Sequence, residues 1–216
     1  GLDLAIVNPK DVRPYPMIPE AERRLAEDLV LDRRDTVGGR IESVPALASL
    51  FLAPGCLLAR MESRAAASPG TLTTTASKTR WTHPVAVLVS HGTTGAAEVL
   101  AGALQDARRA VIVGSPTYGD ASTRSAIPLS DGSTVELTTA RYVTPGGHPI
   151  TGHGIAPDVA AAEGAAPAAG ATAAADSGLE LAFEVVKAAS IIERGAAGGD
   201  ATPAQAGLGR CVIPAA

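Results

Sequence analysis

Aromatic residues and lysines are scarce in this chain. Only 3% of its 216 residues are Phe, Trp or Tyr, and lysine occurs only at Lys10, Lys78 and Lys187. We therefore expect a core of Ala, Val, Leu and Ile, and the chain is long enough to bury one substantial core. The net charge is -4 and no run of Lys and Arg interleaved with aromatics occurs, which argues against a nucleic-acid partner.

The sequence also lacks the features that mark membrane and metal proteins. No apolar run approaches the length of a membrane span and no signal peptide opens the chain. The first residue is Gly rather than Met, which indicates a processed or trimmed chain and leaves open the removal of a secretion signal. The two cysteines lack metal-ligand spacing, and a buried thiol at Cys56 is favoured over a disulfide with Cys211. The pair His148 and His153 is too weak a signal to predict a metal site, and we expect no cofactor.

A strand, a tight glycine turn, a helix and a second strand are predicted within residues 84–119. The apolar run 85–89 stops at Ser90-His91-Gly92, a helical pattern covers about 95–108, and a second apolar run covers 110–113. Such a turn exposes free backbone N–H groups and the positive end of the helix dipole to a ligand. We therefore expect the site of chemistry here.

We divide the chain into five parts. These are a Pro-rich lead (1–26), a core (27–158), an Ala/Gly-rich linker (159–176), a closing helix (177–194) and a flexible tail (195–216). Periodicity predicts strands at 2–7, 29–32 and 56–60, and helices at 20–27 and 41–52. We expect residues 62–82 to form an exposed polar excursion, with Lys78, Arg80 and Trp81 at its edge.

The C-terminal half contains a hairpin signal and a helix signal. Asp131-Gly132 lies between the β-patterned runs 122–129 and 134–142, which predicts a hairpin. Ser177 is the predicted cap of the closing helix. The apolar positions expected on its buried face are Leu179, Leu181, Phe183, Val186 and Ile191.

Residues 128–159 read PLSDGSTVELTTARYVTPGGHPITGHGIAPDV. This segment resembles the C-terminal region of the carboxyl-terminal processing peptidases, or tail-specific proteases, in which PLSDGS, LTTARYYTP and GxGIxPDV follow the catalytic site. The resemblance extends back through AGALQDARRAVIVGSPTYG, more loosely through LVLDRRDTVGGRIESVPALASLFL, and to the closing helix DSGLELAFEVVK. It implies an α/β fold, a ClpP/crotonase-like core of β-β-α units with a C-terminal hairpin and helix.

The resemblance also implies a serine nucleophile, a neutral lysine that activates it and a glutamine that orients the lysine. A serine hydroxyl is a poor nucleophile until a base takes its proton, which a desolvated amine can do. The family pattern GSASASE falls on residues 92–98 and places Gly95 at the nucleophile. The pattern TFGKGSVQ falls on residues 117–124 and places Asp120 at the lysine and Arg124 at the glutamine.

Other parts of the family's site are retained. Asp106 keeps the acidic residue on the helix after the nucleophile. Gly38 and Gly39 keep the paired glycines whose backbone N–H groups would stabilise an oxyanion, although Val37 replaces the family's proline. The family commonly carries a PDZ module ahead of the core, and only a short lead precedes the first core strand here, so we expect that module to be absent from this chain. The resemblance implies an exported or periplasmic protein.

Two hypotheses follow from these replacements. The favoured one is a catalytically inactive homologue that binds a peptide or an unfolded protein C-terminus as a scaffold or regulator, through Gly38, Gly39, Thr93 and Thr94. The alternative is an active serine-type peptidase or hydrolase with a displaced nucleophile. The residues considered for that nucleophile are Thr93, Thr94 and Ser122, with His91 as a base.

Several side chains have simpler interpretations. Thr93 and Thr94 precede a helix and are typical of helix caps. Asp120 and Arg124 are expected to form an ion pair, because side chains an even number of residues apart on a strand share a face. Asp106 is expected to make a helix-end or sheet contact, with a role in shaping the cleft as the alternative, and Lys78 is expected to make a surface contact. The oligomeric state stays open.

Overall fold

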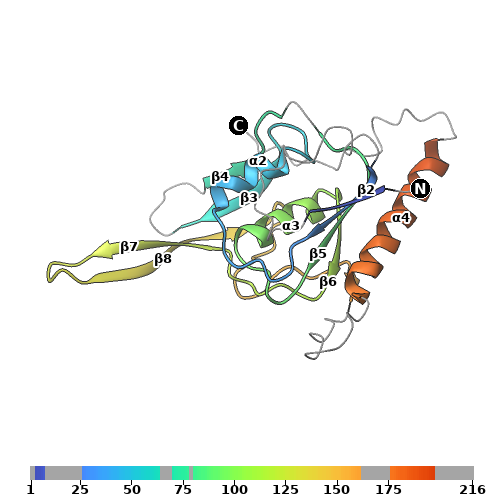
Figure 1. Cartoon of the computed structure of the whole chain (residues 1–216). Coiled ribbons are helices and arrows are strands. Elements are labelled where there is room, and N and C mark those ends of the chain that lie inside the picture. The colour runs from blue at the N-terminus through green and yellow to red at the C-terminus, as the bar shows by residue number, and fades with distance from the viewer. Residues whose placement is uncertain (1–2, 8–25, 64–69, 78–79, 162–175, 198–216) are drawn as a thin grey trace, which may run out of the picture.

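A five-stranded parallel sheet forms the centre of the molecule. The computed structural model describes residues 3–7, 26–63, 70–77, 80–161 and 176–197. The strands lie side by side in the order β1 (Asp3–Val7), β2 (Ala26–Asp32), β5 (Val85–Val89), β6 (Val111–Gly114) and β9 (Val159–Ala160) (Figure 1). Every residue of β5 is buried, as is typical of a parallel sheet covered on both faces.

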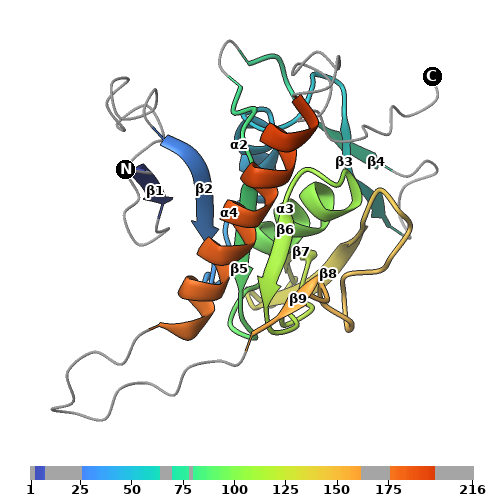
Figure 2. The ribbon, with the colours of Figure 1, turned by 90° about the vertical axis from the view of Figure 1, so that its right-hand side faces the viewer.

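Helices cover both faces of this sheet. Leu29 and Leu31 of β2 pack into the cluster that includes α3 (Ala96–Asp106), η2 (Ile41–Ser43) and α2 (Val44–Ala48). Val30, between them, packs toward α4 (Ser177–Ala197) on the opposite face. The alternation follows from the two-residue period of a strand. Figure 2 shows α4 lying across the sheet.

A second sheet is antiparallel and carries the predicted hairpin. Its order is β4 (Gly70–Thr73), β3 (Leu57–Glu62), β8 (Thr134–Val143) and β7 (Ser122–Pro128). The turn between β7 and β8 has Gly132 at φ 84°, and the Asp131 carboxylate accepts hydrogen bonds from the N–H and hydroxyl of Ser133. The hairpin extends away from the rest of the molecule (Figure 1) and exposes several apolar side chains. They are Ile127, Leu129, Val135 and Leu137.

The predicted helix over residues 41–52 is shorter than expected. It consists of η2 and α2 and ends at Ala48. The N–H groups of both Phe51 and Leu52 donate to the Ala48 carbonyl, at 2.9 Å each, and both side chains are buried. The Phe51 bond spans three residues, as in a 3₁₀ turn, so the helix ends in a tighter turn before Pro54 and Gly55. Residues 26 and 27, assigned to a helix over 20–27, instead belong to β2, and the rest of that predicted helix lies outside the described residues.

The prediction of an exposed excursion over residues 62–82 is partly wrong. Strand β4 pairs with β3, as its two β-branched Thr residues favour. Trp81 is only 8% exposed, and its indole Nε1 donates to the Pro84 carbonyl at 3.3 Å. Arg80 is exposed as expected, and Lys78 lies outside the described residues.

The closing helix is capped by Asp176 rather than by Ser177. The Leu179 N–H donates to Asp176 Oδ1 at 3.1 Å, and the Glu180 N–H donates to the Asp176 carbonyl at 2.8 Å. Ala182 and Val186 of α4 are buried in the core, whereas Ile191, predicted to be buried, is 65% exposed. Single apolar side chains are commonly exposed on protein surfaces, so Ile191 can lie in solvent while Ala182 and Val186 face the core.

Two further expectations are corrected. Cys56 is buried and disulfide-bonded, so the prediction of a free thiol is wrong, and Cys211 lies outside the described residues. Strand β9 falls in the segment assigned to a linker, where its pairing with β6 adds residues 159 and 160 to the sheet. Among the described residues, no helix combines the length and apolar character that crossing a membrane requires.

Candidate functional site

Three loops meet where β2, β5 and β6 end. Residues 33–39 follow β2, residues 90–95 join β5 to α3, and residues 115–121 follow β6. The carboxyl ends of neighbouring parallel strands lie at one edge of a sheet, which is where open α/β sheets bind ligands. Backbone hydrogen bonds join the loops, from Thr94 N to the Thr36 carbonyl at 2.9 Å and from Tyr118 N to the Thr93 carbonyl at 3.1 Å.

Gly95 begins α3 in a backbone conformation that side chains rarely adopt. Its φ is 63° and its ψ is -122°, and glycine is favoured at such positive φ. A Cβ atom at this position would lie 3.0 Å from the carbonyl oxygen of Gly38. The position predicted to match the family's nucleophile therefore has no side chain and is bordered closely by Gly38.

Glu98 is a buried carboxylate that binds two of the three loops. It is fully buried, and its oxygens accept hydrogen bonds from Gly95 N at 3.0 Å, Gly119 N at 2.6 Å and Asp120 N at 2.9 Å. The Thr117 hydroxyl donates a fourth, at 2.5 Å. Four donors on two oxygens satisfy a buried carboxylate without a cation. Glu98 thus fixes Gly95 relative to Asp120.

The role of Glu98 was missed in the sequence, although a signal was present. A Glu three residues after the residue that caps a helix is the spacing of a capping box, in which the Glu accepts from the cap N–H. Gly95 N and Glu98 make this contact. The hydrogen bonds from residues 117, 119 and 120 depend on the packing of a second loop, which no local pattern predicts.

Asp120 and Arg124 form the expected ion pair. Arg124 Nη2 donates to Asp120 Oδ2 at 2.8 Å, and the Ser122 hydroxyl donates to the other carboxylate oxygen at 2.8 Å. The side chains of Asp120 and Arg124 are 34% and 53% exposed. Asp120, predicted to match the family's lysine, is thus an acid engaged by a guanidinium and a hydroxyl.

The hydroxyls of Thr93 and Thr94 contact backbone groups. Thr93 is fully buried, and its hydroxyl donates to the Arg33 carbonyl at 2.9 Å and accepts from Ser90 N at 3.0 Å. Thr94 Oγ1 accepts from Gly38 N at 2.8 Å. The expected capping role is not observed, because α3 has no side-chain cap from either residue and Glu98 serves the cap N–H instead.

Asp106 lies at the far end of α3 from Gly95. Its Oδ2 accepts from Gly146 N at 2.6 Å, and a Cβ at Gly146 would collide with the carboxylate. This is the helix-end contact expected from the sequence. Asp106 holds the turn at residues 145–147 and does not join the loops around Gly95.

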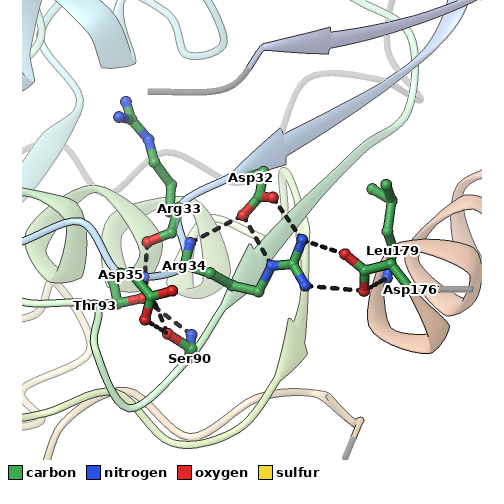
Figure 3. A network of polar contacts seen from close by, with 8 residues as sticks. All are labelled: Asp32, Arg33, Arg34, Asp35, Ser90, Thr93, Asp176 and Leu179. Carbon is green, nitrogen blue, oxygen red and sulfur yellow. Dashed lines mark hydrogen bonds and ion pairs between the residues drawn. The ribbon is translucent and has the colours of Figure 1, made fainter. Parts of the chain in front are cut away.

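A charged network fixes the first loop to α4 (Figure 3). Arg34 donates to both oxygens of Asp32, at 3.1 and 2.7 Å, and to both oxygens of Asp176, at 2.9 and 2.6 Å. These carboxylates, Asp32 first, raise the pKa of Arg34 above its ordinary value, and the Arg34 hydrogen bonds lower the pKa of Asp176. Arg33 points away from this network in Figure 3, and burial lowers its pKa.

A second contact in Figure 3 joins the first two loops. The Ser90 hydroxyl accepts from Asp35 N at 3.1 Å and donates to Asp35 Oδ1 at 3.3 Å. It also accepts from Gly92 N at 3.1 Å. Asp35 has φ 53°, which is uncommon for a residue with a side chain. The loop conformation is thus held by specific hydrogen bonds.

Exposed apolar and aromatic side chains surround the three loops. Val37 is 81% exposed and Tyr118 is 58% exposed. The rings of His91 and Tyr118 lie 5.5 Å apart in a tilted contact. His148 and His153 are exposed, and the described residues contain no group of three or more side chains arranged to hold a metal ion.

The profile of peptidase family S41 matches residues 15–161, which is more than half of the chain. The chain belongs to peptidase family S41. This confirms the resemblance to the carboxyl-terminal processing peptidases.

Two S41 relatives illustrate it. The chloroplastic carboxyl-terminal-processing peptidase 2 of Arabidopsis thaliana is 40% identical over 129 residues, 60% of this chain and 25% of the relative. The carboxyl-terminal-processing protease of Synechocystis sp. is 36% identical over 139 residues, 64% of this chain and 32% of the relative.

This S41 chain thus spans about a quarter to a third of the length of these relatives. Among solved structures, the photosystem II D1 C-terminal processing protease is 34% identical with a TM-score of 0.59, covering 66% of this chain and 36% of that one. A putative peptidase from Parabacteroides merdae has a TM-score of 0.63 at 20% identity, covering 77% and 54% of the two chains, and supports the fold alone. The mixed α/β fold, with one parallel and one antiparallel sheet, is similar to S41 protease structures.

Proposed function

We propose that this S41 chain is a catalytically inactive homologue of the C-terminal processing peptidases that binds a peptide or an unfolded protein C-terminus. The observation that supports this most directly is Gly95, which offers no hydroxyl where the family has its nucleophile. Asp120 adds to the case, because a carboxylate bound by Arg124 is no substitute for a neutral amine. Both replacements lie in loops that Glu98 holds in place.

Two features favour peptide binding at this edge. Strand β7 begins just after Asp120 and is an edge strand of its sheet, so its free side can accept an extended peptide by strand addition. Val37 and Tyr118 offer exposed apolar surface to the side chains of such a peptide. We therefore assign peptide binding to Gly38, Gly39 and Thr94, and we assign the fold to the ClpP/crotonase-like class. Thr93, which the sequence also suggested as a binding residue, is fully buried and cannot contact a peptide.

One observation favours the alternative of an active hydrolase. The Ser122 hydroxyl donates to the Asp120 carboxylate at 2.8 Å, which is within the reach of a nucleophile and its base. Against this, Arg124 engages the same carboxylate. Thr93 and Thr94 are weaker candidates, because the Thr93 hydroxyl donates to a backbone carbonyl and the Thr94 hydroxyl accepts from a backbone N–H.

Incubation with an unfolded protein tests this function. Purified chain is mixed with reduced, carboxymethylated lactalbumin, binding is followed by biolayer interferometry, and products are followed by mass spectrometry. We expect binding without cleavage. The Ser122→Ala variant, prepared in parallel, controls for contaminating peptidases, because a contaminant would act equally in both samples. Cleavage by the wild type that is absent in Ser122→Ala would instead establish the hydrolase.

We also propose an exported or periplasmic location. The disulfide at Cys56 supports it, because disulfides persist mainly in oxidising compartments. We expect cell fractionation to find the protein outside the cytoplasm. We expect thiol labelling to find Cys56 oxidised. A cytoplasmic protein with a reduced Cys56 would contradict this location.

A further inference from the structure

A cavity lies at the edge of the parallel sheet opposite the three loops. It has a volume of about 300 Å³ and lies where β5 and β6 begin, between the end of α3 and the C-terminal half of α4. The loops around Gly95 follow the other ends of these strands, so the cavity is separate from the candidate site. Its volume is at the lower end of the range for small-molecule sites. The cavity is therefore large enough for one small ligand.

Arg109 lines this cavity with a guanidinium that the fold holds in place. Its Nε and Nη2 donate to the carbonyls of Phe51, Trp81 and His83, and the residue is only 6% exposed. Its Nη1 carries two further N–H groups, which donate to no group in the described part of the chain. Nη1 is not fully enclosed, so solvent reaches it through the cavity. Since buried donors are nearly always paired, these two N–H groups indicate an acceptor that enters the cavity.

Glu193 of α4 lines the same cavity and is also unpaired. It is half-buried and takes part in no hydrogen bond or ion pair with the residues that the structure describes. Burial lowers the pKa of Arg109, and the charge of Glu193 opposes that shift, which indicates that the two groups lie near each other. Asp158, the other acid of the cavity, accepts from Gln105 Nε2 at 2.9 Å and from Ile112 N at 2.7 Å. The cavity thus presents a pair of donors on Arg109 and a separate acceptor on Glu193.

We propose that this cavity binds a free α-amino acid. Its carboxylate accepts hydrogen bonds from Arg109 Nη1 and is favoured further by the charge of Arg108, which also lines the cavity. Its ammonium donates to the Glu193 carboxylate. The side chain of the amino acid packs on the apolar part of the lining, which includes Val85 and Val111.

A ligand with both charges fits this cavity better than a ligand with one. An anion alone leaves the Glu193 carboxylate without a donor and close to a like charge, and a cation alone does the same to Arg109. Both arrangements leave a charge without a partner away from bulk water, which costs free energy. A peptide carries its two terminal charges far apart, so neither end alone satisfies both groups. The charges of the cavity therefore favour a free amino acid, and this assignment does not depend on the peptide binding proposed above.

Titration of the isotope-labelled full chain with three matched ligands tests this inference. The ligands are L-leucine, N-acetyl-L-leucine, which keeps the carboxylate and lacks the ammonium, and L-leucinamide, which keeps the ammonium and lacks the carboxylate. Binding is followed by NMR through the backbone amides of Ala110 and Val111, two residues that line the cavity. We expect L-leucine to shift both amides and to bind about tenfold more tightly than either derivative.

Two variants of α4 locate the binding. Glu193→Gln keeps the size of the side chain and removes its charge, and we expect it to weaken L-leucine binding about tenfold. Ala189→Leu fills part of the cavity with a larger side chain and is expected to abolish binding. The matched controls are Glu184→Gln and Ala188→Leu, at exposed positions of the same helix that do not line the cavity, and both should bind as the wild type does. Arg109 is not substituted, because its contacts with three carbonyls also support the fold.

Three results would overturn this inference. Absence of any shift with L-leucine would show that solvent alone fills the cavity. Binding of either derivative as tightly as L-leucine would show that one charge is sufficient. Unchanged L-leucine binding in both Glu193→Gln and Ala189→Leu would place the amino acid elsewhere on the molecule. Each of these results leaves the proposed peptide binding intact, because that binding is assigned to the opposite edge of the sheet.

Discussion

Gly95 and Glu98 are three residues apart and contribute to the site in opposite ways. Gly95 has no side chain and adopts the positive-φ backbone conformation that the turn requires. Glu98 keeps its carboxylate buried and holds that turn against the loop after β6. The two residues thus fix the backbone of the turn at the start of α3.

Gly95→Ser is expected to lower the stability of the protein and to produce no catalytic activity. Gly95→Ser places a Cβ at positive φ and against the Gly38 carbonyl, which costs about 1–3 kcal/mol of unfolding free energy. Urea unfolding, followed by the fluorescence of Trp81, the single tryptophan, measures this. Ala96→Ser, one residue on and inside the helix, is the matched control. Unchanged stability together with labelling of the new serine by a fluorophosphonate would contradict the prediction.

The Glu98 carboxylate is expected to be required as a hydrogen-bond acceptor. Glu98→Gln sets an amide NH₂ against groups that all donate, so at least one buried donor loses its acceptor, at a cost of about 1–3 kcal/mol. Urea unfolding of the variant measures the loss. Glu180→Gln, in the exposed first turn of α4, is the control and should leave stability nearly unchanged. Equal effects of the two substitutions would show that the buried contacts contribute little.

At the scale of secondary-structure elements, α4 is attached to the sheet in two ways. Ala182 and Val186 pack against Val30 and Leu88 of the sheet, and Asp176 at the start of the helix binds Arg34. Apolar packing is insensitive to pH, whereas the Asp176 contact is not. The contributions of the two attachments to stability can therefore be separated by measuring unfolding as a function of pH.

Acid is expected to weaken the attachment of α4. The Arg34 hydrogen bonds lower the pKa of Asp176 below 3.8 in the folded protein, so their stabilisation is complete above that pH and is lost as the pH falls through the lower, folded value. Thermal unfolding between pH 6 and pH 2.5 should show a steeper acid loss for the wild type than for Asp176→Asn. The difference between the two curves isolates this residue from other carboxylates. Parallel curves would contradict the assignment.

At the scale of the whole molecule, Arg109 joins segments that are far apart in the sequence. It is 6% exposed, and it donates to the carbonyls of Phe51 at 3.2 Å, Trp81 at 2.6 Å and His83 at 2.8 Å. Burial lowers its pKa to about 10, so the guanidinium remains charged at neutral pH. Arg109 thus connects the end of α3 to the segment after α2 and to the entry of β5.

Arg109→Lys is expected to destabilise the fold despite the conserved charge. A lysine amine lacks the planar fork that reaches three carbonyls, and the unfolding free energy should fall by about 1–3 kcal/mol. Circular dichroism during urea unfolding avoids any local effect on Trp81. The neighbouring Arg108, which is exposed, gives the control Arg108→Lys, expected to be neutral. A neutral Arg109→Lys would show that the charge alone is sufficient.

The sequence predicted features that depend on short stretches of chain. Alternation and apolar runs predicted β2, β5, β6 and the β7–β8 hairpin, and the Asp-Gly pair predicted the turn between the last two. Motif spacing predicted the peptidase family to which the chain belongs. The roles of positions 95, 120 and 124 stay predictions. These features follow from local backbone preference and residue order, which the sequence contains directly.

Only the tertiary structure decided which groups meet. Arg34 and Asp176 are 142 positions apart, and Gly38 and Thr94 are 56 apart, so no local pattern links either pair. The burial of Trp81 and the exposure of Ile191 likewise depend on how distant segments pack together. The sequence by itself determined that position 95, predicted to match the family's nucleophile, is a glycine. The fold determined that Gly38 borders that glycine and that the Gly38 N–H binds Thr94, because such contacts arise only when distant segments pack together.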